Sequence, residues 1–289
     1  MPAYSLEQAY DHCLRLAASH YENFPVASVL LPRRLRRPVA VIYAFARTAD
    51  DIADEGDADT EERLRALDEY EKQLTQLESG ATANDPVFIA LADVIARYTL
   101  PLDLFHDLLS AFRQDVTKKR YVDFAEVLDY CRRSANPVGR LLLHLNDDAA
   151  EENLLASDRI CSALQLINFM QDLQQDYVEN GRIYLPQQEM QQFGVDEERL
   201  GEGRSDEKMQ ALAAYQLRRI EAMMNEGAIL GGRLTGRFGL EIRLIIAAGL
   251  KVVEKLSHHD GDLFARPRLG KRDYLQIIRQ ALFGRFPPP

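Results

Sequence analysis

The sequence has few cysteines, no long apolar run and no excess of basic residues, and each absence excludes a class of protein. Cys13, Cys131 and Cys161 are widely spaced and odd in number, which fits reduced thiols better than a disulfide framework. The apolar runs, such as residues 244–250, are much shorter than the roughly 20 residues that span a bilayer. The formal net charge of -10 argues against a general nucleic-acid-binding protein, because such a surface repels phosphate.

The start of the sequence also lacks the features of a secreted protein. Met-Pro-Ala-Tyr-Ser-Leu-Glu contains neither a basic segment nor an apolar one, so we expect no signal peptide. Of the 289 residues, 46% are hydrophobic and 28% are charged, a balance typical of a globular protein with a large buried core. We therefore expect a soluble, cytoplasmic protein.

The apolar residues that are present recur at spacings of three and four, and no segment alternates convincingly at period two. This pattern predicts an all-α protein. The predicted helices span 5–19, 26–31, 38–55, 60–79, 86–98, 101–118, 124–134, 137–147, 155–178, 206–228, 237–257 and 271–283. Capping residues mark several starts: Ser5 with Gln8, Asp59 with Glu62, Asp123 with Glu126, and Asp85 before Pro86.

The chain shows no obvious division into domains. It has no linker rich in proline or serine and no repeat at solenoid spacing. We predict a single domain over residues 1–289, with a frayed tail at 284–289. The polar, glycine-rich segment 194–206 is predicted to form an exposed loop.

A stripe of polar side chains interrupts the apolar pattern of the predicted helix 38–55. It consists of Tyr43, Arg47, Asp50 and Asp54 at positions i, i+4, i+7 and i+11, with Asp51 beside them. Carboxylates four residues apart on one helix repel each other, so a cation is needed to stabilise them. Mg²⁺ suits these oxygen ligands, because it commonly bridges carboxylates to the phosphate of a substrate.

A second stripe lies on the predicted helix 155–178. It consists of Gln165, Asn168, Asp172 and Asp176 on a helix whose other positions are largely apolar. A solvated acidic face would be the ordinary interpretation of one such carboxylate pair. Two pairs, each on an apolar helix and each with Arg or amide neighbours in register, favour a metal site.

Two segments that carry these stripes resemble the aspartate-rich motifs of the squalene/phytoene synthase family. They are AFARTADDIADE at 44–55 and INFMQDLQQDYVENGRIYLP at 167–186. RYVDFAEVLDYCRRSANPVG at 120–139 and FPVASVLLPRRLR at 24–36 resemble that family's central and N-terminal helices. The resemblance implies the isoprenoid synthase fold, in which helices surround a deep apolar cavity and the two aspartate helices face each other at its mouth.

The resemblance also implies a role for each matching residue. The implied ligands of Mg²⁺–diphosphate are Asp50, Asp51, Asp54, Asn168, Asp172 and Asp176. Arg47, Arg182 and Tyr184 match residues near the diphosphate. Tyr43 and Gln165 match residues that line the reaction cavity, and together with Asn168 they are the expected catalytic residues.

Two departures from the family pattern point to one branch. Gln171 stands where members that join two prenyl diphosphates usually carry Arg, and Asn23-Phe24 stands where they usually carry Ser-Phe. The segments YENFPVAS, NFMQD and YCRRSANPVG resemble the branch that forms hydroxysqualene in bacterial hopanoid pathways. The resemblance therefore implies a Mg²⁺-dependent carbon–oxygen lyase that converts presqualene diphosphate into hydroxysqualene without NADPH.

Two alternative functions stay open. The first is head-to-head condensation of two prenyl diphosphates, as in presqualene diphosphate, squalene or phytoene synthases. The second is a non-catalytic assembly or scaffold protein of the same fold, which the four retained motif aspartates disfavour. The expected partners are the prenyl diphosphate substrate and pathway enzymes, and no nucleic acid is expected.

The C-terminal region differs from the rest of the chain in charge. From Phe264 to the end it holds six Arg or Lys residues and one acid, Asp273. An apolar stripe runs through it, formed by Tyr274, Ile277, Ile278, Ala281 and Leu282. This pattern predicts either a basic amphipathic helix that holds the protein at the inner membrane surface, or a helix docked on the core with solvated arginines.

Overall fold

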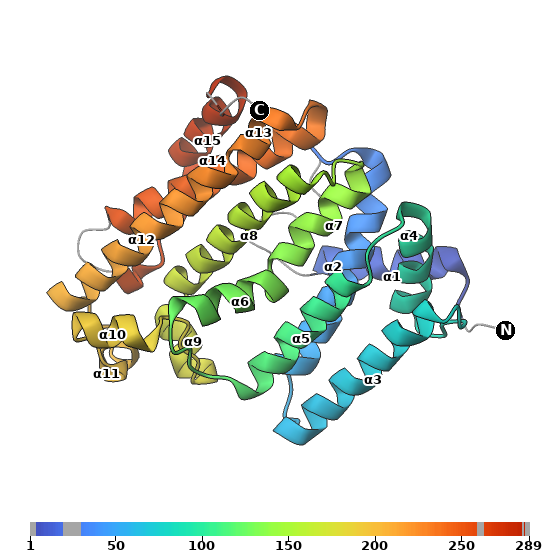
Figure 1. The fold of residues 1–289 in the computed structure, drawn as a ribbon, viewed down its shortest axis with the longest axis horizontal. Helices are drawn as coiled ribbons and strands as arrows, with labels where there is room; N and C mark the ends of the chain where they lie inside the picture. The colour runs from blue at the N-terminus through green and yellow to red at the C-terminus, as the bar shows by residue number, and fades with distance from the viewer. Residues whose placement is uncertain (1–3, 20–29, 259–262, 285, 287–289) are drawn as a thin grey trace. The chain divides into compact units, whose positions relative to one another are not determined.

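A computed structural model describes residues 4–19, 30–258, 263–284 and 286 (Figure 1). Within this part of the chain every regular element is a helix, so the all-α prediction is confirmed. The helix predicted at 26–31, the Asn23-Phe24 pair and the tail 284–289 lie wholly or largely outside the described residues.

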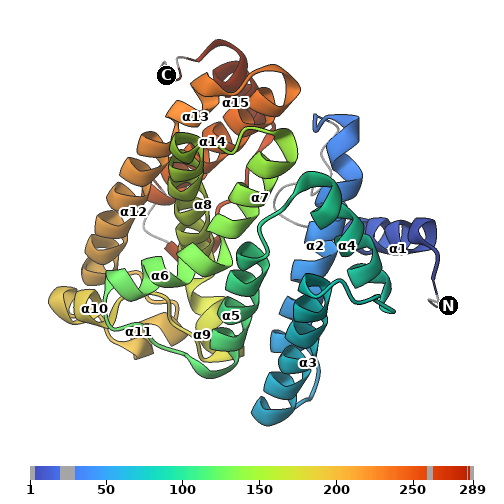
Figure 2. The ribbon, with the colours of Figure 1, turned by 45° about the vertical axis from the view of Figure 1, so that its right-hand side comes forward.

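The residues group into two compact units. The first comprises Met1–Thr117 with Pro137–Ala149, and the second comprises Lys118–Asn136 with Ala150–Pro289. The first unit contains α1 (Leu6–Ser19), α2 (Arg33–Asp54), α3 (Thr60–Glu78), α4 (Pro86–Tyr98), α5 (Asp103–Thr117) and all but the first residue of α7 (Asn136–Asn146). The second contains α6 (Phe124–Ser134), α8 (Glu151–Gln171), α9 (Leu173–Asn180), α10 (Gln187–Phe193), α11 (Glu197–Gly201), α12 (Glu207–Gly227), α13 (Ile229–Arg233), α14 (Gly236–Ser257), the 3₁₀ turn η1 (Leu263–Ala265) and α15 (Lys271–Phe283), as Figure 2 shows from a second side. The prediction of one domain over 1–289 stays a prediction.

Helix α2 begins earlier than its sequence predicts. It starts at Arg33 and continues through Pro38, where the prediction placed its first residue. A proline inside a helix has no N–H for the carbonyl four residues before it, here that of Arg34. The hydroxyl of Tyr98 on α4 donates a hydrogen bond to this carbonyl at 3.3 Å. A side chain of the neighbouring helix therefore replaces the bond that Pro38 cannot make.

An aromatic cluster in the core of the first unit fixes the rotation of α2. The rings of Tyr70, Phe88 and Phe105 lie 5.2, 5.9 and 5.3 Å from that of Phe45 between centroids, and all four residues are buried. The Tyr70 hydroxyl also donates to the Phe45 carbonyl at 3.2 Å. Because Phe45 faces the core, the polar stripe of the same helix lies on the opposite side.

The helix predicted at 155–178 is interrupted, so the prediction of one continuous helix is wrong. It begins at Glu151 and ends at Gln171, and Asp172 (φ -110, ψ 14) separates α8 from α9. The N–H of Asp172 still donates to the Asn168 carbonyl at 3.0 Å, and that of Asp176 to the Asp172 carbonyl at 2.8 Å. The stripe consequently keeps its helical register across the break.

Three short helices are absent from the prediction. Helices α10, α11 and α13 have five to seven residues, too few for the spacing of apolar residues to reveal them. Because α11 lies within 194–206, the prediction of a plain loop there is wrong. The Asp196 side chain caps this helix at the Arg199 N–H, and the Arg199 guanidinium pairs with Asp206 at 2.8 Å.

The predicted caps are confirmed with one exception. Reciprocal hydrogen bonds form between Ser5 and Gln8 and between Asp59 and Glu62. Asp123 accepts from the Glu126 N–H at 3.0 Å. The Glu126 carboxylate, however, accepts from the Val122 N–H and from Lys118 at 2.8 and 2.9 Å, so this box is only half formed.

The structure tests two expectations drawn from the sequence, which concern disulfides and membrane-spanning helices. All three cysteines are free thiols, with Cys13 and Cys131 buried and Cys161 half-buried. No helix in the described ranges is long and apolar enough to cross a membrane.

Candidate functional site

The predicted residues of the first stripe gather along α2, and we call them the α2 cluster: Tyr43, Arg47, Asp50, Asp51 and Asp54. The Arg47 guanidinium is its centre. It pairs with Asp51 at 2.6 Å, with Glu55 at 2.5 Å and with Asp50 at 3.4 Å. One cation thus faces three carboxylates, so the cluster retains excess negative charge that a further cation can neutralise.

Within this cluster, the pKa of the Asp50 carboxyl group is raised. Burial raises its pKa to about 7, with a further rise from the Asp54 carboxylate and, more weakly, Asp115, against the opposing effect of Arg47. Its side chain nevertheless keeps 40% of its surface exposed, so a cation can still reach it. At neutral pH this carboxyl is poised to release a proton when positive charge arrives.

Asp115 on α5 is a member of this environment that the sequence analysis missed. It is only 4% exposed and contributes to the raised pKa of Asp50. A signal for it exists in the sequence, because Leu104, Leu108, Ala111 and Asp115 follow the spacing of one helix face. An acid that continues a buried apolar stripe is a candidate functional group, as are two acids four residues apart.

The second set of predicted residues lies in the second unit, and we call it the α8–α9 cluster: Gln165, Asn168, Asp172, Asp176, Arg182 and Tyr184. Arg182 follows α9, and its backbone N–H donates to the Asp176 carbonyl at 3.0 Å. Its guanidinium donates to the Tyr184 hydroxyl at 3.2 Å, and both side chains are buried. The Tyr184 ring stacks on Phe169 of α8 with centroids 3.6 Å apart. This stack holds the segment after α9 against α8.

Arg266 joins the α8–α9 cluster from a distant part of the sequence, and the sequence analysis missed it. Its guanidinium lies 2.9 Å from Asp172 and also donates to Gln175 at 3.4 Å. Burial raises the pKa of Asp172 and the Glu179 carboxylate adds to the rise, whereas Arg266 opposes both. A cation therefore does stand beside the second motif, although position 171 carries Gln.

The donor chemistry of both clusters fits Mg²⁺. Nowhere in the described part of the chain do three His, Cys, Asp or Glu side chains converge as a complete metal cage. Mg²⁺, however, usually binds through one or two carboxylates and completes its shell with water and substrate phosphate. Asp51 Oδ1 and Asp172 Oδ1 are buried oxygens that accept no hydrogen bond, and each faces a guanidinium as an ion pair only. A carboxylate oxygen has more than one acceptor site, so each can also bind a hard cation.

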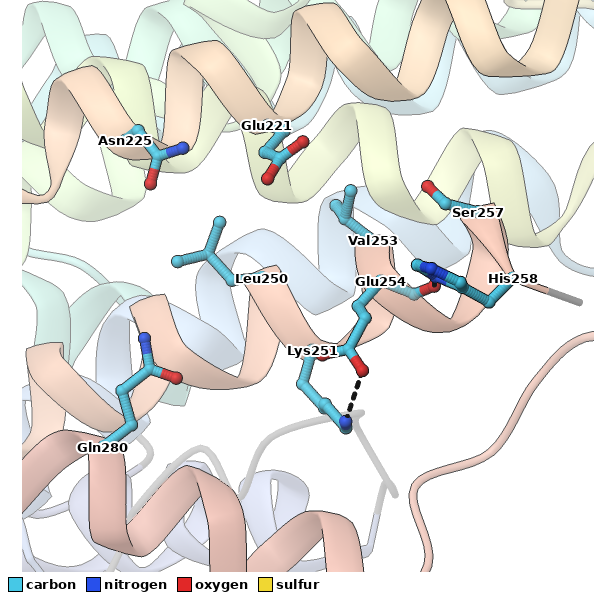
Figure 3. Close-up of a pocket in the computed structure, with 9 residues that line it drawn as sticks. All are labelled: Glu221, Asn225, Leu250, Lys251, Val253, Glu254, Ser257, His258 and Gln280. Atoms are coloured by element: carbon cyan, nitrogen blue, oxygen red, sulfur yellow. Dashed lines mark hydrogen bonds and ion pairs between the residues drawn. The ribbon is translucent and has the colours of Figure 1, made fainter. Parts of the chain in front are cut away.

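A pocket lies in the second unit (Figure 3). Its lining side chains come from α12, α14, the residue that follows α14, and α15: Glu221, Asn225, Leu250, Lys251, Val253, Glu254, Ser257, His258 and Gln280. His258, the residue after the last turn of α14, forms a hydrogen bond with the Glu254 carbonyl at 2.8 Å. No predicted site residue lines this pocket.

Known proteins resemble this chain in sequence and in structure. The hydroxysqualene synthases of Sinorhizobium fredii and Rhodopseudomonas palustris are each 36% identical, over 85% and 86% of this chain and 83% and 84% of their own lengths. A crystal structure of squalene synthase HpnC from Alicyclobacillus acidocaldarius is 35% identical with a TM-score of 0.81, over 87% of this chain and 94% of that chain. A dehydrosqualene synthase in complex with a ligand, 24% identical over 96% of both chains, has the same fold with a TM-score of 0.84.

These comparisons first define the class of protein, which is an all-helical protein of the isoprenoid synthase fold. The sequence profile of squalene/phytoene synthases matches residues 17–273. The chain therefore belongs to the squalene/phytoene synthase family, whose members process prenyl diphosphates.

Proposed function

We propose that this protein converts presqualene diphosphate into hydroxysqualene and diphosphate with Mg²⁺ as cofactor, which makes it a carbon–oxygen lyase of hopanoid synthesis. Its similarity to hydroxysqualene synthases over most of the chain supports this reaction. The observation that carries the proposal is that Asp51 and Asp172, at positions that match the two aspartate-rich motifs of the family, each pair with a guanidinium group.

The carboxylates of each cluster are proposed ligands of Mg²⁺. Asp50, Asp51 and Asp54 come from the α2 cluster, and Asn168, Asp172 and Asp176 come from the α8–α9 cluster. When bound, Mg²⁺ supplies positive charge that stabilises the departing diphosphate. Arg47 and Arg182 are the proposed protein cations for the same oxygens, because a guanidinium stays charged and its fork matches phosphate. Tyr184 holds Arg182 through the hydrogen bond described above.

The proposed reaction balances without a reductant. The carbon–oxygen bond to diphosphate breaks, and both electrons leave with the diphosphate. The cyclopropylcarbinyl cation reopens into an allylic cation, water adds its oxygen to that cation, and one proton is released. NADPH is therefore not required.

Water capture needs a polar group that holds one water beside an apolar wall. Tyr43, Gln165 and Asn168 are our candidates, and each is half-buried in the structure. Gln165 and Asn168 lie one turn apart on the same face of α8, ahead of Asp172.

Head-to-head condensation is the second candidate, and Arg266 favours it. The Gln at position 171 argued against condensation because it removes a cation from the second motif. The guanidinium of Arg266 at 2.9 Å from Asp172 provides a cation there by another route. Phytoene synthases also occur among the relatives, one of them from Mycobacterium bovis at 33% identity over 66% of this chain and 61% of its own length.

Product identification separates these functions. Purified full-length protein is incubated with presqualene diphosphate or with farnesyl diphosphate, with and without Mg²⁺ and NADPH, in ¹⁸O-labelled water. We expect Mg²⁺-dependent hydroxysqualene from presqualene diphosphate, with ¹⁸O in the alcohol and no effect of NADPH. Efficient condensation of farnesyl diphosphate, or squalene formed only with NADPH, would contradict the proposal. Either result would assign the protein to the enzymes that condense two prenyl diphosphates head to head. No product from either substrate would support the scaffold alternative.

A further inference from the structure

Helix α15 packs on α14 through only one edge. Ile277 and Ala281 are 5% and 2% exposed, and Ile277 joins a buried cluster with Ala247 and Ala248 of α14. Figures 1 and 2 both show the two helices side by side. The prediction of a core-docked helix is therefore confirmed for this edge. Only two residues of the predicted apolar stripe, Ile277 and Ala281, are buried there, and the other three are exposed.

The adjacent edge of α15 leaves large apolar side chains in solvent. Tyr274, Ile278 and Leu282 follow each other at i, i+4 and i+8 and are 54%, 47% and 54% exposed. Leu275 and Phe283, 69% and 80% exposed, extend this edge. Eleven large hydrophobic residues are exposed in the described part of the chain, and five of them lie on this one helix. We call these five residues the α15 face.

The charges around the α15 face are positive. Arg268, Lys271, Arg272 and Arg279 are all exposed. The only acid of the helix, Asp273, accepts hydrogen bonds from Lys255 and from the Gly270 N–H, each at 2.7 Å. It is thus neutralised by a lysine of α14. The apolar edge therefore carries a local positive charge on a protein whose net charge is -10.

We infer that the α15 face binds the surface of an anionic lipid bilayer, with the helix axis parallel to the membrane. Residues spaced at i, i+4 and i+8 form a line along the helix, so a flat surface meets all of them at once. Apolar side chains of such a helix enter the boundary of the acyl chains, while arginines and lysines bind anionic headgroups. This inference stands independently of the proposed function.

Charge complementarity favours lipid over a second copy of this chain. A symmetric contact between two α15 faces would bring Lys271, Arg272 and Arg279 of one copy against the same residues of the other. Anionic headgroups neutralise these side chains, whereas a second copy adds repulsion. The dimer remains an outcome that the experiment distinguishes.

The absence of tryptophan from the sequence provides a specific probe. Leu275→Trp places a single tryptophan on the α15 face, and Leu155→Trp places one at a comparably exposed position, 56%, on α8. Each full-length variant is mixed with vesicles of phosphatidylcholine, with or without phosphatidylglycerol, some carrying brominated acyl chains. We expect a blue shift and bromine quenching for Leu275→Trp only, with the anionic vesicles only, and both signals weakened by high salt.

Binding of tryptophan-free variants completes the test. Leu275→Gln with Ile278→Gln should lower the vesicle partition coefficient at least about tenfold in flotation. The matched pair Leu155→Gln with Val122→Gln, exposed at 56% and 48%, should leave it unchanged. Three results overturn the inference: no binding to anionic vesicles at low salt, equal binding by the α15 variant, or a blue shift that appears without lipid and grows with protein concentration. The last result would identify the face as a contact between copies.

Discussion

At the scale of single residues, Asp50 and Asp172 follow the same physical logic. Burial raises the pKa of each, nearby carboxylates raise it further, and one guanidinium opposes the rise. That guanidinium belongs to Arg47 on the same helix in the first case and to Arg266 in the second. Both carboxyl groups therefore lie where added positive charge has a large effect on their ionisation.

The first prediction concerns the proton on Asp50. Its pKa of about 7 lies above the ordinary value of 3.8, so the folded protein holds a proton that the unfolded chain releases. The contribution of Asp50 to the free energy of unfolding therefore falls as pH rises from about 4 to 7. Asp50→Asn should raise this free energy by about 1 kcal/mol at about pH 8, a value reduced by solvent screening, and should change it little at about pH 4. Urea unfolding at both pH values measures the difference, and an equal gain at both would contradict it.

The second prediction concerns the cation beside Asp172. Arg266→Gln should lower kcat/KM for the diphosphate substrate at least about tenfold, because it removes a charge-assisted contact. Adding Gln171→Arg to this variant should restore most of the loss, since it returns a cation to the same motif. Arg268→Gln is the matched control and should have little effect in detergent, where membrane binding plays no part. Unchanged kinetics of Arg266→Gln would contradict the role assigned to Arg266.

At the scale of elements, α2 depends on a contact that replaces a missing backbone hydrogen bond. The Tyr98 hydroxyl satisfies the Arg34 carbonyl, which Pro38 leaves without a donor. Tyr98→Phe should lower the free energy of unfolding by about 0.5–1 kcal/mol. In a Pro38→Ala background the loss should shrink, because residue 38 then carries an N–H. The coupling in this double-mutant cycle is the measurement, and strictly additive effects would contradict the account.

The sequence predicted the long helices and both stripes, because spacing and caps are local signals. Asp59 and Glu62 form the expected box, and Tyr43 to Asp54 lie on one helix as predicted. The break at Asp172 was not predicted, since the residues on either side continue the helical pattern. Arg266 was missed for a different reason. Its contact with Asp172 depends on how α14 and η1 return the chain to the second motif, which no local pattern encodes.

At the scale of the whole molecule, acidic and basic side chains have different proposed roles. Five of the 45 Asp and Glu residues belong to the α2 and α8–α9 clusters, where they are proposed metal ligands. Basic side chains gather on α15, where we expect the bilayer. The family profile covers residues of both units, so the membership applies to the chain as a whole. The roles of individual site residues and the single domain stay predictions.

The most direct test of the central claim is turnover by the variant Asp54→Asn with Asp172→Asn. We expect Mg²⁺-dependent turnover to fall at least about a thousandfold, because each cluster loses a proposed ligand of the metal. Helical content should stay unchanged and Tm without metal should equal or exceed that of the wild type, because like charges are removed. Asp57→Asn, at an exposed loop position, is the control and should keep full activity. Full activity of the double variant would contradict the claim that these aspartates bind the Mg²⁺–diphosphate.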